Sequence, residues 1–503
     1  MINILEYLEY TCGRVPDKCA FADDKDTISF KQLYNQAASV GTVLLKTGIY
    51  KKPVVVFMQK KPKAIAAFLG AVYAGCYYVP VDEEMPRFRL ELIFETLKPE
   101  AVICDETTVD MLLKLNYSGK QFIYDEICSH DIDKSMLDEV REKSIDTDPV
   151  YIVFTSGSTG IPKGVVACHR SVIDYIENLS QVLEVTEDTV FGNQAPLYVD
   201  ACLKEIYPTL KYGATAYLIP KQLFMFPVQL VEFLNKYKIN TICWVVPALT
   251  MVSGLGAFEK AVPQYLKTVA FGSEVFPVRQ FKLWKKYVPQ ARYINLYGPT
   301  EATGMSCYYV VDRDFEENEA IPIGKPFRNT EILLLDGSGQ ETPFGEKGEI
   351  CIRGTAVTLG YYKQFDKTAE SFVQNPLNLL YPEIIYRTGD LGFFNERGEL
   401  MFASRKDYQI KHMGHRIELG EIEMAVNQNA GVESCCCIYE EEKKKIILYY
   451  TGLASVEELT AFVKEKLPRY MLPNAVRQIQ RLPLTLNGKV DRLALKEMWK
   501  NNK

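Results

Sequence analysis

One segment of the chain combines hydroxyl, glycine and lysine residues in a pattern suited to binding phosphate. Residues 151–164 read YIVFTSGSTGIPKG, an apolar stretch that leads directly into a turn. Glycines let the backbone turn tightly and present its N–H groups to an anion, while hydroxyls and a lysine add donors and positive charge. The order differs from the GxxxxGK[ST] of P-loop NTPases, and alone it is equally typical of a surface loop. The candidate phosphate-binding residues are Thr155, Ser156, Gly157, Ser158, Thr159, Gly160 and Lys163.

Cysteine and histidine give no sign of a metal site. The chain has 13 Cys and 4 His, but no CxxC pair occurs and the His do not combine with Cys at zinc spacing. His412 and His415 are separated by a stretch containing Gly414, which favours a surface loop. The run 435–437, three Cys in an apolar stretch, fits a strand with buried free thiols. Free thiols indicate a reducing, cytoplasmic setting.

Composition indicates a soluble multidomain protein. With 503 residues the chain exceeds one hydrophobic core, so two or more domains are expected. A net charge of −6 with interspersed acids and bases gives no indication of nucleic-acid binding. No segment reaches the roughly 18 uninterrupted apolar residues of a membrane span. The first ten residues lack the basic start of a signal peptide and predict an amphipathic helix, and we expect no carrier module after the last helix.

The elements that must position these residues alternate along the first 330 residues. Strand-like and helix-like stretches in alternation predict α/β layers with largely parallel sheets. We expect helices at 65–73 and 227–237, and strands at 77–81, 101–104, 151–155 and 241–246.

The pattern of expected helices and strands changes twice in the last third of the chain. Strand-like stretches at 330–335 and 349–353 joined by Gly-rich turns predict a β-rich subdomain at about 330–406. From there we expect a small α+β domain, 407–503, with helices at 418–428 and 456–466. The predicted fold class is therefore α/β, with a large N-terminal domain, 1–406, of two α/β-layered subdomains plus the β-rich one, and a small C-terminal domain.

Five further motifs follow in order along the chain, and together they resemble the motifs of a known protein family. They are AGCYYVPVDEEMPRFRL (74–90), LYGPTEAT (296–303), YRTGDLG (386–392), SRKDYQIKHMGHRIELGEIE (404–423) and LPLTLNGKVDR (482–492). Together with 151–164 they resemble the adenylate-forming superfamily of acyl-CoA synthetases, luciferases and nonribosomal peptide synthetase adenylation domains, over essentially the whole chain. The resemblance implies an ATP-dependent, AMP-forming enzyme that activates a carboxylate.

The resemblance also implies a nucleotide site. Tyr297 would stack on adenine, and Asn295 would touch the adenine amino group. Asp390 and Arg405 would bind the ribose, and Thr300 the α-phosphate. Glu301 would bind Mg²⁺, because a hard cation bridging phosphates prefers a carboxylate. The remaining nucleotide-binding residues by resemblance are Gly272, Ser273, Glu274, Leu296, Gly298, Pro299 and Phe402.

Two residues near the C-terminus gain roles in the same way. Lys489, in a tight Asn-Gly turn, resembles the catalytic lysine that bridges the substrate carboxylate and the α-phosphate. Neutralising charge around phosphorus is the main requirement, since the nucleophile is already ionised near pH 7. Asp407 lies at the family's hinge position, so that the C-terminal domain would act as a mobile lid. Together with Thr300 and Glu301, Lys489 forms the predicted catalytic set.

The segment QAPLYVDACLKEIYPTL indicates the kind of carboxylate. Asp200 lies where amino-acid-activating members place an aspartate against the substrate ammonium, and an unpaired buried Asp would otherwise be costly. By motif alignment the substrate pocket would be lined by Asp200, Ala201, Lys204, Trp244, Ala270, Gly272, Leu296, Gly304 and Met305.

Lys204 occupies a normally apolar pocket position. A lysine there would need an anionic partner, which favours a substrate with an acidic side chain such as glutamate or aspartate. The competing interpretation is that Lys204 pairs with neighbouring Glu205 or extends out to solvent.

Several functions stay open at this stage. The leading one is a stand-alone amino-acid ligase that feeds the phosphopantetheine thiol of a separate carrier protein, with coenzyme A as another possible acceptor. A D-alanine–carrier protein ligase is similar in length, but its pattern has Cys-Gly where this chain has Gly272-Ser273. An acyl- or aryl-CoA synthetase is disfavoured by Asp200, and a non-catalytic relative by intact Lys489, Glu301 and Asp390.

Overall fold

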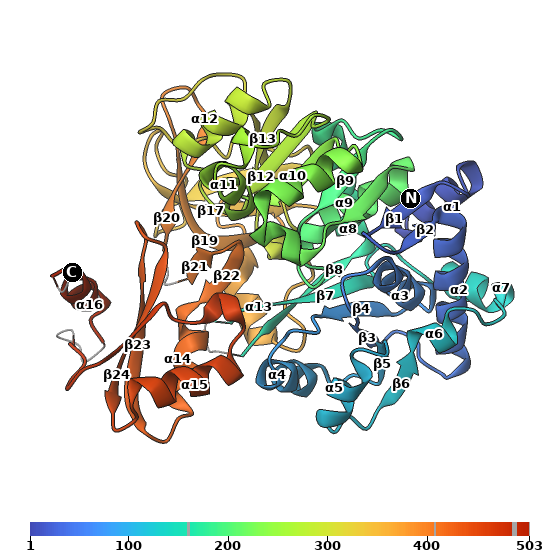
Figure 1. Cartoon of the computed structure of the whole chain (residues 1–503), viewed down its shortest axis with the longest axis horizontal. Helices are drawn as coiled ribbons and strands as arrows, with labels where there is room; N and C mark the ends of the chain where they lie inside the picture. The colour runs from blue at the N-terminus through green and yellow to red at the C-terminus, as the bar shows by residue number, and fades with distance from the viewer. Residues whose placement is uncertain (158–160, 407–408, 485–489, 502–503) are drawn as a thin grey trace. The chain divides into compact units, whose positions relative to one another are not determined.

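The computed structural model describes residues 1–157, 161–406, 409–484 and 490–501 (Figure 1). The chain divides into two compact units. The first comprises Met1–Glu83, Pro99–Val153 and Gly164–Lys406. The second comprises Glu84–Lys98, Phe154–Lys163 and Asp407–Lys503, so two segments from the first third of the chain cluster with the C-terminal residues.

A six-stranded sheet, in the order β6-β5-β3-β4-β7-β8, is formed by the first third of the described chain. The pairs β3–β4, β3–β5, β4–β7 and β5–β6 are all parallel. Strand β3, PVVVF, is buried at every position, as expected for a parallel strand covered on both faces. The strands are β3 (Pro53–Phe57), β4 (Tyr77–Val81), β5 (Ala101–Cys104), β6 (Lys120–Ile123), β7 (Pro149–Thr155) and β8 (Lys163–Cys168).

Helices α2 and α3 pack together beside this sheet. Helix α2 begins with a capping box, because the Ser29 side chain accepts from the Gln32 N–H and the Gln32 side chain accepts from the Ser29 N–H. Helix α3 is buried almost all round, which is typical of a helix inside a core. The helices of this part are α1 (Leu5–Arg14), α2 (Phe30–Lys46), α3 (Pro62–Tyr73), α4 (Arg87–Leu97), α5 (Val109–Lys114), α6 (Tyr124–Ile127) and α7 (Lys134–Glu142).

A nine-stranded sheet, in the order β15-β14-β13-β12-β11-β9-β10-β1-β2, carries most of the candidate site. Its centre, from β13 to β10, is parallel, whereas β14, β15 and β2 add antiparallel edges. The strands are β1 (Cys19–Ala22), β2 (Thr27–Ser29), β9 (Val190–Asn193), β10 (Thr215–Leu218), β11 (Thr241–Val245), β12 (Thr268–Gly272), β13 (Arg292–Tyr297), β14 (Cys307–Val310) and β15 (Lys325–Pro326).

The two faces of the nine-stranded sheet belong to different cores. One face packs on α8 (His169–Leu183) and α9 (Leu203–Tyr212), in a core that continues to the six-stranded sheet. The other face packs on α10 (Pro227–Lys236), α11 (Val246–Gly254) and α12 (Val278–Tyr287), which gather beside β12 in Figure 1. Alternate residues of each strand therefore point into different cores.

A smaller, antiparallel sheet follows in the order β16-β17-β19-β18, and β20 pairs with β19. A short helix, α13 (Phe365–Ser371), precedes β18. The strands are β16 (Thr330–Leu335), β17 (Gly348–Gly354), β18 (Phe372–Gln374), β19 (Ile384–Phe394) and β20 (Leu400–Arg405).

The C-terminal part of the second unit has its own core. The hairpin β21–β22 precedes a three-stranded sheet, β23-β24-β25, in which β25 runs parallel to β24. Apolar residues of α14 and α15 pack on this sheet. The elements are β21 (Gln409–His412), β22 (His415–Glu418), α14 (Leu419–Asn427), β23 (Val432–Glu440), β24 (Lys445–Gly452), α15 (Val456–Lys466), β25 (Ala475–Gln478) and α16 (Arg492–Asn501).

The fold class predicted from the sequence is confirmed: the protein is a mixed α/β structure with a large N-terminal part and a small C-terminal one. Over the described ranges, we find no helix of the length and apolar character that crossing a membrane requires. The 13 cysteines are free thiols. Burial raises the pKa of Cys436 to about 12, so this thiol is protonated at neutral pH.

Candidate active site

The predicted adenine-binding residues lie where two neighbouring parallel strands end. Strand β12 ends at Gly272, which is in register with Leu296 near the end of β13. A Cβ atom at Gly272 would lie 2.3 Å from the Leu296 carbonyl oxygen, so this strand end requires glycine. Ser273 follows with a φ of 69°, left-handed backbone that turns the chain away, and Glu274 is half-buried. The carboxyl edge of a parallel sheet is where α/β folds bind ligands.

Asn295, one residue before Leu296, is held by the main chain. Its side-chain Nδ2 donates to the carbonyl oxygens of Ile321 at 3.4 Å and Pro322 at 2.8 Å. With the nitrogen used in this way, the amide oxygen Oδ1 is the atom that can accept from an amino group.

Three of the predicted nucleotide-binding side chains meet at Asp390. Its Oδ2 accepts a hydrogen bond from the Tyr297 hydroxyl at 2.6 Å, and its Oδ1 forms an ion pair with Arg405 Nη1 at 2.7 Å. Asp390 on β19 is paired with Arg405 on β20, so the sheet itself brings them together. Burial, and then the neighbouring Asp390 carboxylate, raises the pKa of Tyr297 well above its ordinary value, so it is a hydrogen-bond donor here. Phe402 packs on the apolar cluster that contains Tyr297.

The loop after β13 is closed by backbone contacts. A Cβ atom at Gly298 would lie 2.5 Å from the Gly304 carbonyl oxygen and 2.5 Å from the Ser306 nitrogen. The Ser306 N–H donates to the Tyr297 carbonyl at 2.7 Å. A one-turn 3₁₀ helix, η4 (Thr300–Ala302), forms inside this loop directly after Pro299. The loop therefore holds two of the three predicted catalytic residues, Thr300 and Glu301, on a fixed backbone.

Glu301 is fully buried and held from two sides. Its Oε1 accepts from the Tyr361 hydroxyl at 2.8 Å, and its main-chain oxygen accepts from the Thr358 N–H at 2.9 Å. Among the residues that the structure describes, no group of three or more His, Cys, Asp or Glu is arranged to hold a metal. One buried carboxylate fits Mg²⁺, which is usually bound by one or two carboxylates together with substrate phosphates and water.

Asp200 lies beside this loop at the start of α9, in the 3₁₀ turn η1 (Asp200–Cys202). The Thr300 side chain lies close enough to its carboxylate to favour the ionised form. Burial raises its pKa, an effect opposed by Thr300 and by the charge of Lys204 and reinforced by Glu301. The structure thus brings the predicted ammonium partner and the predicted α-phosphate contact together.

The register of the sheet decides which residues face Asp200. Ala270 is paired with Cys243 on one side and Ile294 on the other, and these three share a core with Leu296 and Met305. Trp244 was expected in the same pocket but points to the opposite face.

Trp244 packs instead in the core beneath α10 to α12. Its Nε1 donates to the Gly192 carbonyl at 2.7 Å, and its ring meets Phe224 edge-on. Because neighbouring residues of a strand point to opposite faces, an alignment shift of one position exchanges Trp244 for Cys243. Cys243 is therefore the β11 residue on the Asp200 side. Ala201 packs against the same core.

The phosphate-loop residues belong to the second unit and are described within it. Ser156 Oγ donates to the Arg416 carbonyl at 2.7 Å and accepts from the Glu418 N–H at 3.2 Å. Thr155 Oγ1 is buried without a hydrogen-bond partner, and Lys163 is buried at the start of β8. The remaining predicted residues of the loop, Ser158, Thr159 and Gly160, lie outside the described residues, as do Asp407 and Lys489.

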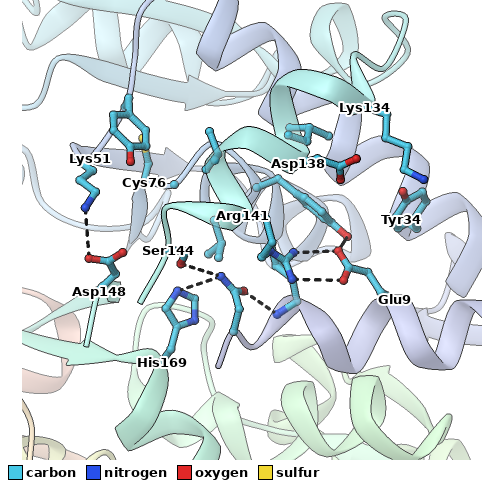
Figure 2. A pocket seen from close by; sticks show the side chains of 18 of the residues that line it. Glu9, Tyr34, Lys51, Cys76, Lys134, Asp138, Arg141, Ser144, Asp148 and His169 are labelled. Carbon is cyan, nitrogen blue, oxygen red and sulfur yellow. Dashed lines mark hydrogen bonds and ion pairs between the residues drawn. The ribbon is translucent and has the colours of Figure 1, made fainter. Parts of the chain in front are cut away.

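A separate cavity of about 440 Å³ lies in the first unit between α1 and α7 (Figure 2). Arg141 forms a two-point ion pair with Glu9, and Lys51 pairs with Asp148 at its rim. His169 Nδ1 accepts from the Ile4 N–H at 3.2 Å. None of the predicted site residues lines this cavity, and its paired charges indicate a structural role.

Sequence reasoning missed Tyr361, Cys243 and Asn193, whereas it named Glu205 only as a possible partner of Lys204. Each acts through a neighbour in space: Tyr361 on Glu301, and Asn193 on Glu205 through a hydrogen bond of 3.2 Å. The alternation of β11 could have identified Cys243 once Ala270 was chosen, but the others required the fold.

Comparison with known proteins identifies the family. Residues 8–362 match the model of AMP-binding enzymes, and residues 421–489 match that of the AMP-binding enzyme C-terminal domain. Tyrocidine synthase 1 from Brevibacillus parabrevis is 30% identical over 513 residues, which cover 98% of this chain and 45% of that protein. Bacitracin synthase 1 from Bacillus licheniformis is 30% identical over 98% of this chain and 9% of that protein. The chain thus spans less than half the length of these curated relatives.

Solved structures share the fold. The protein PA1221, described as containing adenylation and PCP domains, superposes with a TM-score of 0.83 at 23% identity, covering 99% of this chain and 84% of that one. The Vibrio cholerae adenylation domain AlmE, solved with glycyl-adenosine-5′-phosphate, gives a TM-score of 0.83 at 19% identity over 99% and 98%. With the family match over two thirds of its residues, the chain belongs to the AMP-binding enzymes and is an ATP-dependent, AMP-forming ligase related to nonribosomal peptide synthetase adenylation domains.

Proposed function

We propose that this chain activates an amino acid and passes it to the phosphopantetheine thiol of a separate carrier protein. The observation that carries the proposal is the Asp200 carboxylate, which lies beside Thr300 on the loop that follows β13. A carboxylate at this point gives a substrate ammonium its counter-ion, while Thr300 stands next to the reacting carboxylate and the α-phosphate. Fatty or aryl acids have no ammonium to pair with Asp200.

The chemistry proceeds in two steps. A carboxylate oxygen of the amino acid attacks the α-phosphorus of ATP, the bond to the β-phosphate oxygen breaks, and pyrophosphate leaves with its electron pair. The thiolate of the carrier then attacks the carbonyl carbon of the aminoacyl-AMP, and AMP leaves. The first step needs stabilisation of negative charge more than a general base, because the carboxylate is already ionised near pH 7. In the second step the carrier thiol must first lose its proton to solvent or a base.

The residues of the first unit divide these tasks. Tyr297 and Asn295 would bind adenine, and Asp390 with Arg405 would bind the ribose, so that the α-phosphate lies at Thr300. Glu301, oriented by Tyr361, would hold Mg²⁺. When bound, this ion supplies positive charge to the phosphate oxygens.

The second unit would supply the rest. Thr155, Ser156, Gly157 and Lys163, with residues 158–160, would bind the departing pyrophosphate. Lys489 would bridge the carboxylate and the α-phosphate in the first step. A turn of the segment 407–503 about Asp407 would then replace Lys489 with the face around Gly414 and admit the thiol.

The decisive experiment is ATP–pyrophosphate exchange across a panel of D- and L-amino acids, with acyl and aryl acids as comparison. Amino-acid-dependent exchange supports the proposal. Exchange only with acyl or aryl acids would replace it with a CoA synthetase. Loading of a phosphopantetheinylated carrier against loading of coenzyme A then identifies the acceptor, and preference for D-alanine would identify a D-alanine–carrier protein ligase.

The substrate class follows from the buried Lys204, and we propose an amino acid with an acidic side chain. Lys204 lies one helical turn after Asp200 and is only 3% exposed. An ammonium buried on the pocket side needs an anion, and the substrate side chain can supply it. Lys204→Met should lower exchange with glutamate or aspartate at least tenfold and leave the matching amides, glutamine and asparagine, much less affected. Strong exchange of the wild type with alanine or bulky apolar amino acids, and none with acidic ones, would contradict this substrate class.

A further inference from the structure

Lys204 and Glu205 are consecutive residues of α9 and carry opposite charges inside the protein. Their side chains are 3% and 0% exposed. Charged side chains are seldom buried to this degree unless paired. Among the described residues, however, the Lys204 ammonium has neither a hydrogen bond nor an ion pair within 4 Å. Two adjacent buried charges with incomplete partners are the starting point of the inference.

Glu205 is only half satisfied. Its Oε2 accepts a hydrogen bond from Asn193 Nδ2 at 3.2 Å, while its Oε1 has no partner. The Oδ1 atom of the same Asn193 amide is also buried without a partner. A fully ionised carboxylate with one donor is poorly stabilised in a buried site, whereas a protonated one could donate to the vacant acceptor. The geometry therefore accommodates both protonation states.

The charged and titratable groups that face Glu205 come from five elements. From its own helix comes Lys204, and from the preceding turn Cys202, whose pKa is raised by burial and then by Glu205. The others are Lys60 from the loop after β3, Cys243 from β11 and Tyr175 from α8, with the Asn193 amide from β9.

Lys60 is the second cation and it has partners of its own. Its Nζ donates to the carbonyl oxygens of Asn193 at 3.1 Å, Gln194 at 3.1 Å and Ile219 at 3.4 Å. Burial lowers the pKa of Lys60 to about 7, and burial raises the pKa of Glu205 to about 7. Lys60 is held by the main chain, whereas the carboxyl groups whose charges interact with Lys204 are Glu205 and Asp200.

Cys243 lies within the electrostatic influence of both the Glu205 and the Lys204 side chains. Burial raises the pKa of its thiol well above the usual range, and the next two influences are the charges of Glu205 and Lys204, of opposite sign. Cys243 is on the same side of the sheet as Ala270 and Leu296. The charge at Glu205 is therefore felt where a substrate side chain would lie.

We propose that Glu205 is a specificity-determining residue of this pocket: ionised, it neutralises Lys204 and disfavours acidic side chains, and protonated, it leaves the Lys204 ammonium to the acid group of the substrate. The inference rests on the proposed function, because it requires an amino acid in the pocket. Binding an acidic substrate then carries one proton from solvent to Glu205 Oε1, and no other bond changes. A neutral side chain binds without this proton.

The test compares an acidic amino acid with its own amide. The ratio of kcat/KM for glutamate to that for glutamine, from pyrophosphate exchange, cancels pH effects on ATP and on Asp200. In the wild type this ratio should fall by up to about tenfold per pH unit above pH 7, because binding selects protonated Glu205. In Glu205→Gln it should stay at its high value from pH 6 to 8.5. Aspartate and asparagine serve equally if they are the better pair.

Two control variants separate the sources of the effect. Lys60→Arg keeps a positive charge throughout this range and should retain the pH dependence of the wild type. Glu232→Gln, on the exposed side of α10, should leave both ratio and activity unchanged. A flat ratio in the wild type, an unchanged slope in Glu205→Gln, or a slope lost in Lys60→Arg would each overturn the inference.

The substrate panel distinguishes failure of the acidic-substrate proposal from failure of the proposed activation of an amino acid. If the wild type exchanges only apolar amino acids, the acidic substrate and this inference both fail, while the Asp200-dependent activation of an amino acid stands. If Glu205→Gln does not fold, calorimetry on the wild type in two buffers of different ionisation enthalpy replaces it. Glutamate binding should take up about one proton at pH 8, and no uptake would overturn the inference.

Discussion

At the residue scale, Asp200 is surrounded by groups that change its affinity for a proton. Burial and Glu301 favour its neutral form, whereas Thr300 and Lys204 favour its charge. A substrate ammonium would complete this set of partners. Substitution of Asp200 should therefore weaken amino-acid binding strongly. Under the proposed function, Asp200 would be the residue that distinguishes amino acids from other carboxylic acids.

Asp200→Asn should raise the KM for the amino acid by about 100-fold. Removing the charge turns an ion-paired hydrogen bond of about 1.5–3 kcal/mol into a neutral one and leaves the substrate ammonium unpaired. Pyrophosphate exchange at varied amino-acid concentration measures this, and the KM for ATP should change little. Unaltered amino-acid KM would exclude Asp200 as the ammonium partner.

At the scale of single elements, the loop from Gly298 to Ser306 depends on close backbone contacts. Three atoms, including the Gly304 oxygen, lie 2.5 Å from the position of a Cβ at Gly298. Real Cβ atoms do not approach backbone so closely, so a side chain here must displace the loop that carries Thr300 and Glu301.

Gly298→Ala should therefore lower stability by about 1–3 kcal/mol and weaken ATP binding. Gly337→Ala is the matched control, since nothing lies within 4 Å of its Cβ position. Thermal unfolding and the KM for ATP measure the two effects. Equal behaviour of the two variants would mean that the loop tolerates displacement.

Elements were the part of the fold best predicted from sequence. The expected strands at 77–81, 101–104 and 330–335 match β4, β5 and β16 residue for residue, and the helix at 456–466 matches α15. Long apolar runs bounded by turn residues determine such elements locally. The antiparallel edge strands, by contrast, are short and depend on pairing with a neighbour: β14 pairs with β13, and β15 pairs with β14.

Side-chain contacts were predicted less completely than elements. The motifs predicted that Tyr297, Asp390 and Arg405 belong to one site, because each residue lies in a recognisable motif. Trp244 was misplaced, since the face of a strand depends on its register with β12, and a single-residue error reverses it. Glu205 was considered as a partner of Lys204, but its half-satisfied state depends on Asn193, which the sequence does not single out.

At the scale of the whole molecule, His169 couples the start of the chain to α8. Its Nδ1 accepts from the Ile4 N–H, and its Nε2 lies 3.4 Å from Asn3 Nδ2. The side chain is only 3% exposed. Burial lowers the pKa of His169 to about 4, against an ordinary value of about 6.5.

Stability should therefore fall as the pH is lowered from 6.5 to 4. In this window the unfolded chain binds a proton at His169 that the folded chain does not, and the contribution amounts to about 3 kcal/mol. Denaturant unfolding at several pH values measures it. His169→Gln should flatten the slope, whereas the exposed His130→Gln should retain it; identical slopes for both would assign the pH dependence elsewhere.

The proposed turn of the C-terminal segment also belongs to this scale. Asp407→Pro should preserve pyrophosphate exchange and reduce carrier loading at least tenfold, because proline fixes φ at the residue that must change it. Measuring both half-reactions on one preparation checks this. An equal loss of both, or full loading, would remove Asp407 from the hinge role.

The ion pair between Asp390 and Arg405 has one more consequence. Arg405 is the last residue of β20, and the next N–H, that of Lys406, donates to the Gly389 carbonyl at 2.8 Å. A ribose bound to Asp390 and Arg405 would therefore tighten the last rungs of the sheet before the chain enters the second unit. Amide hydrogen exchange along 400–406 becomes a gauge of nucleotide occupancy: slow while ATP or the adenylate is bound, and fast once AMP has left.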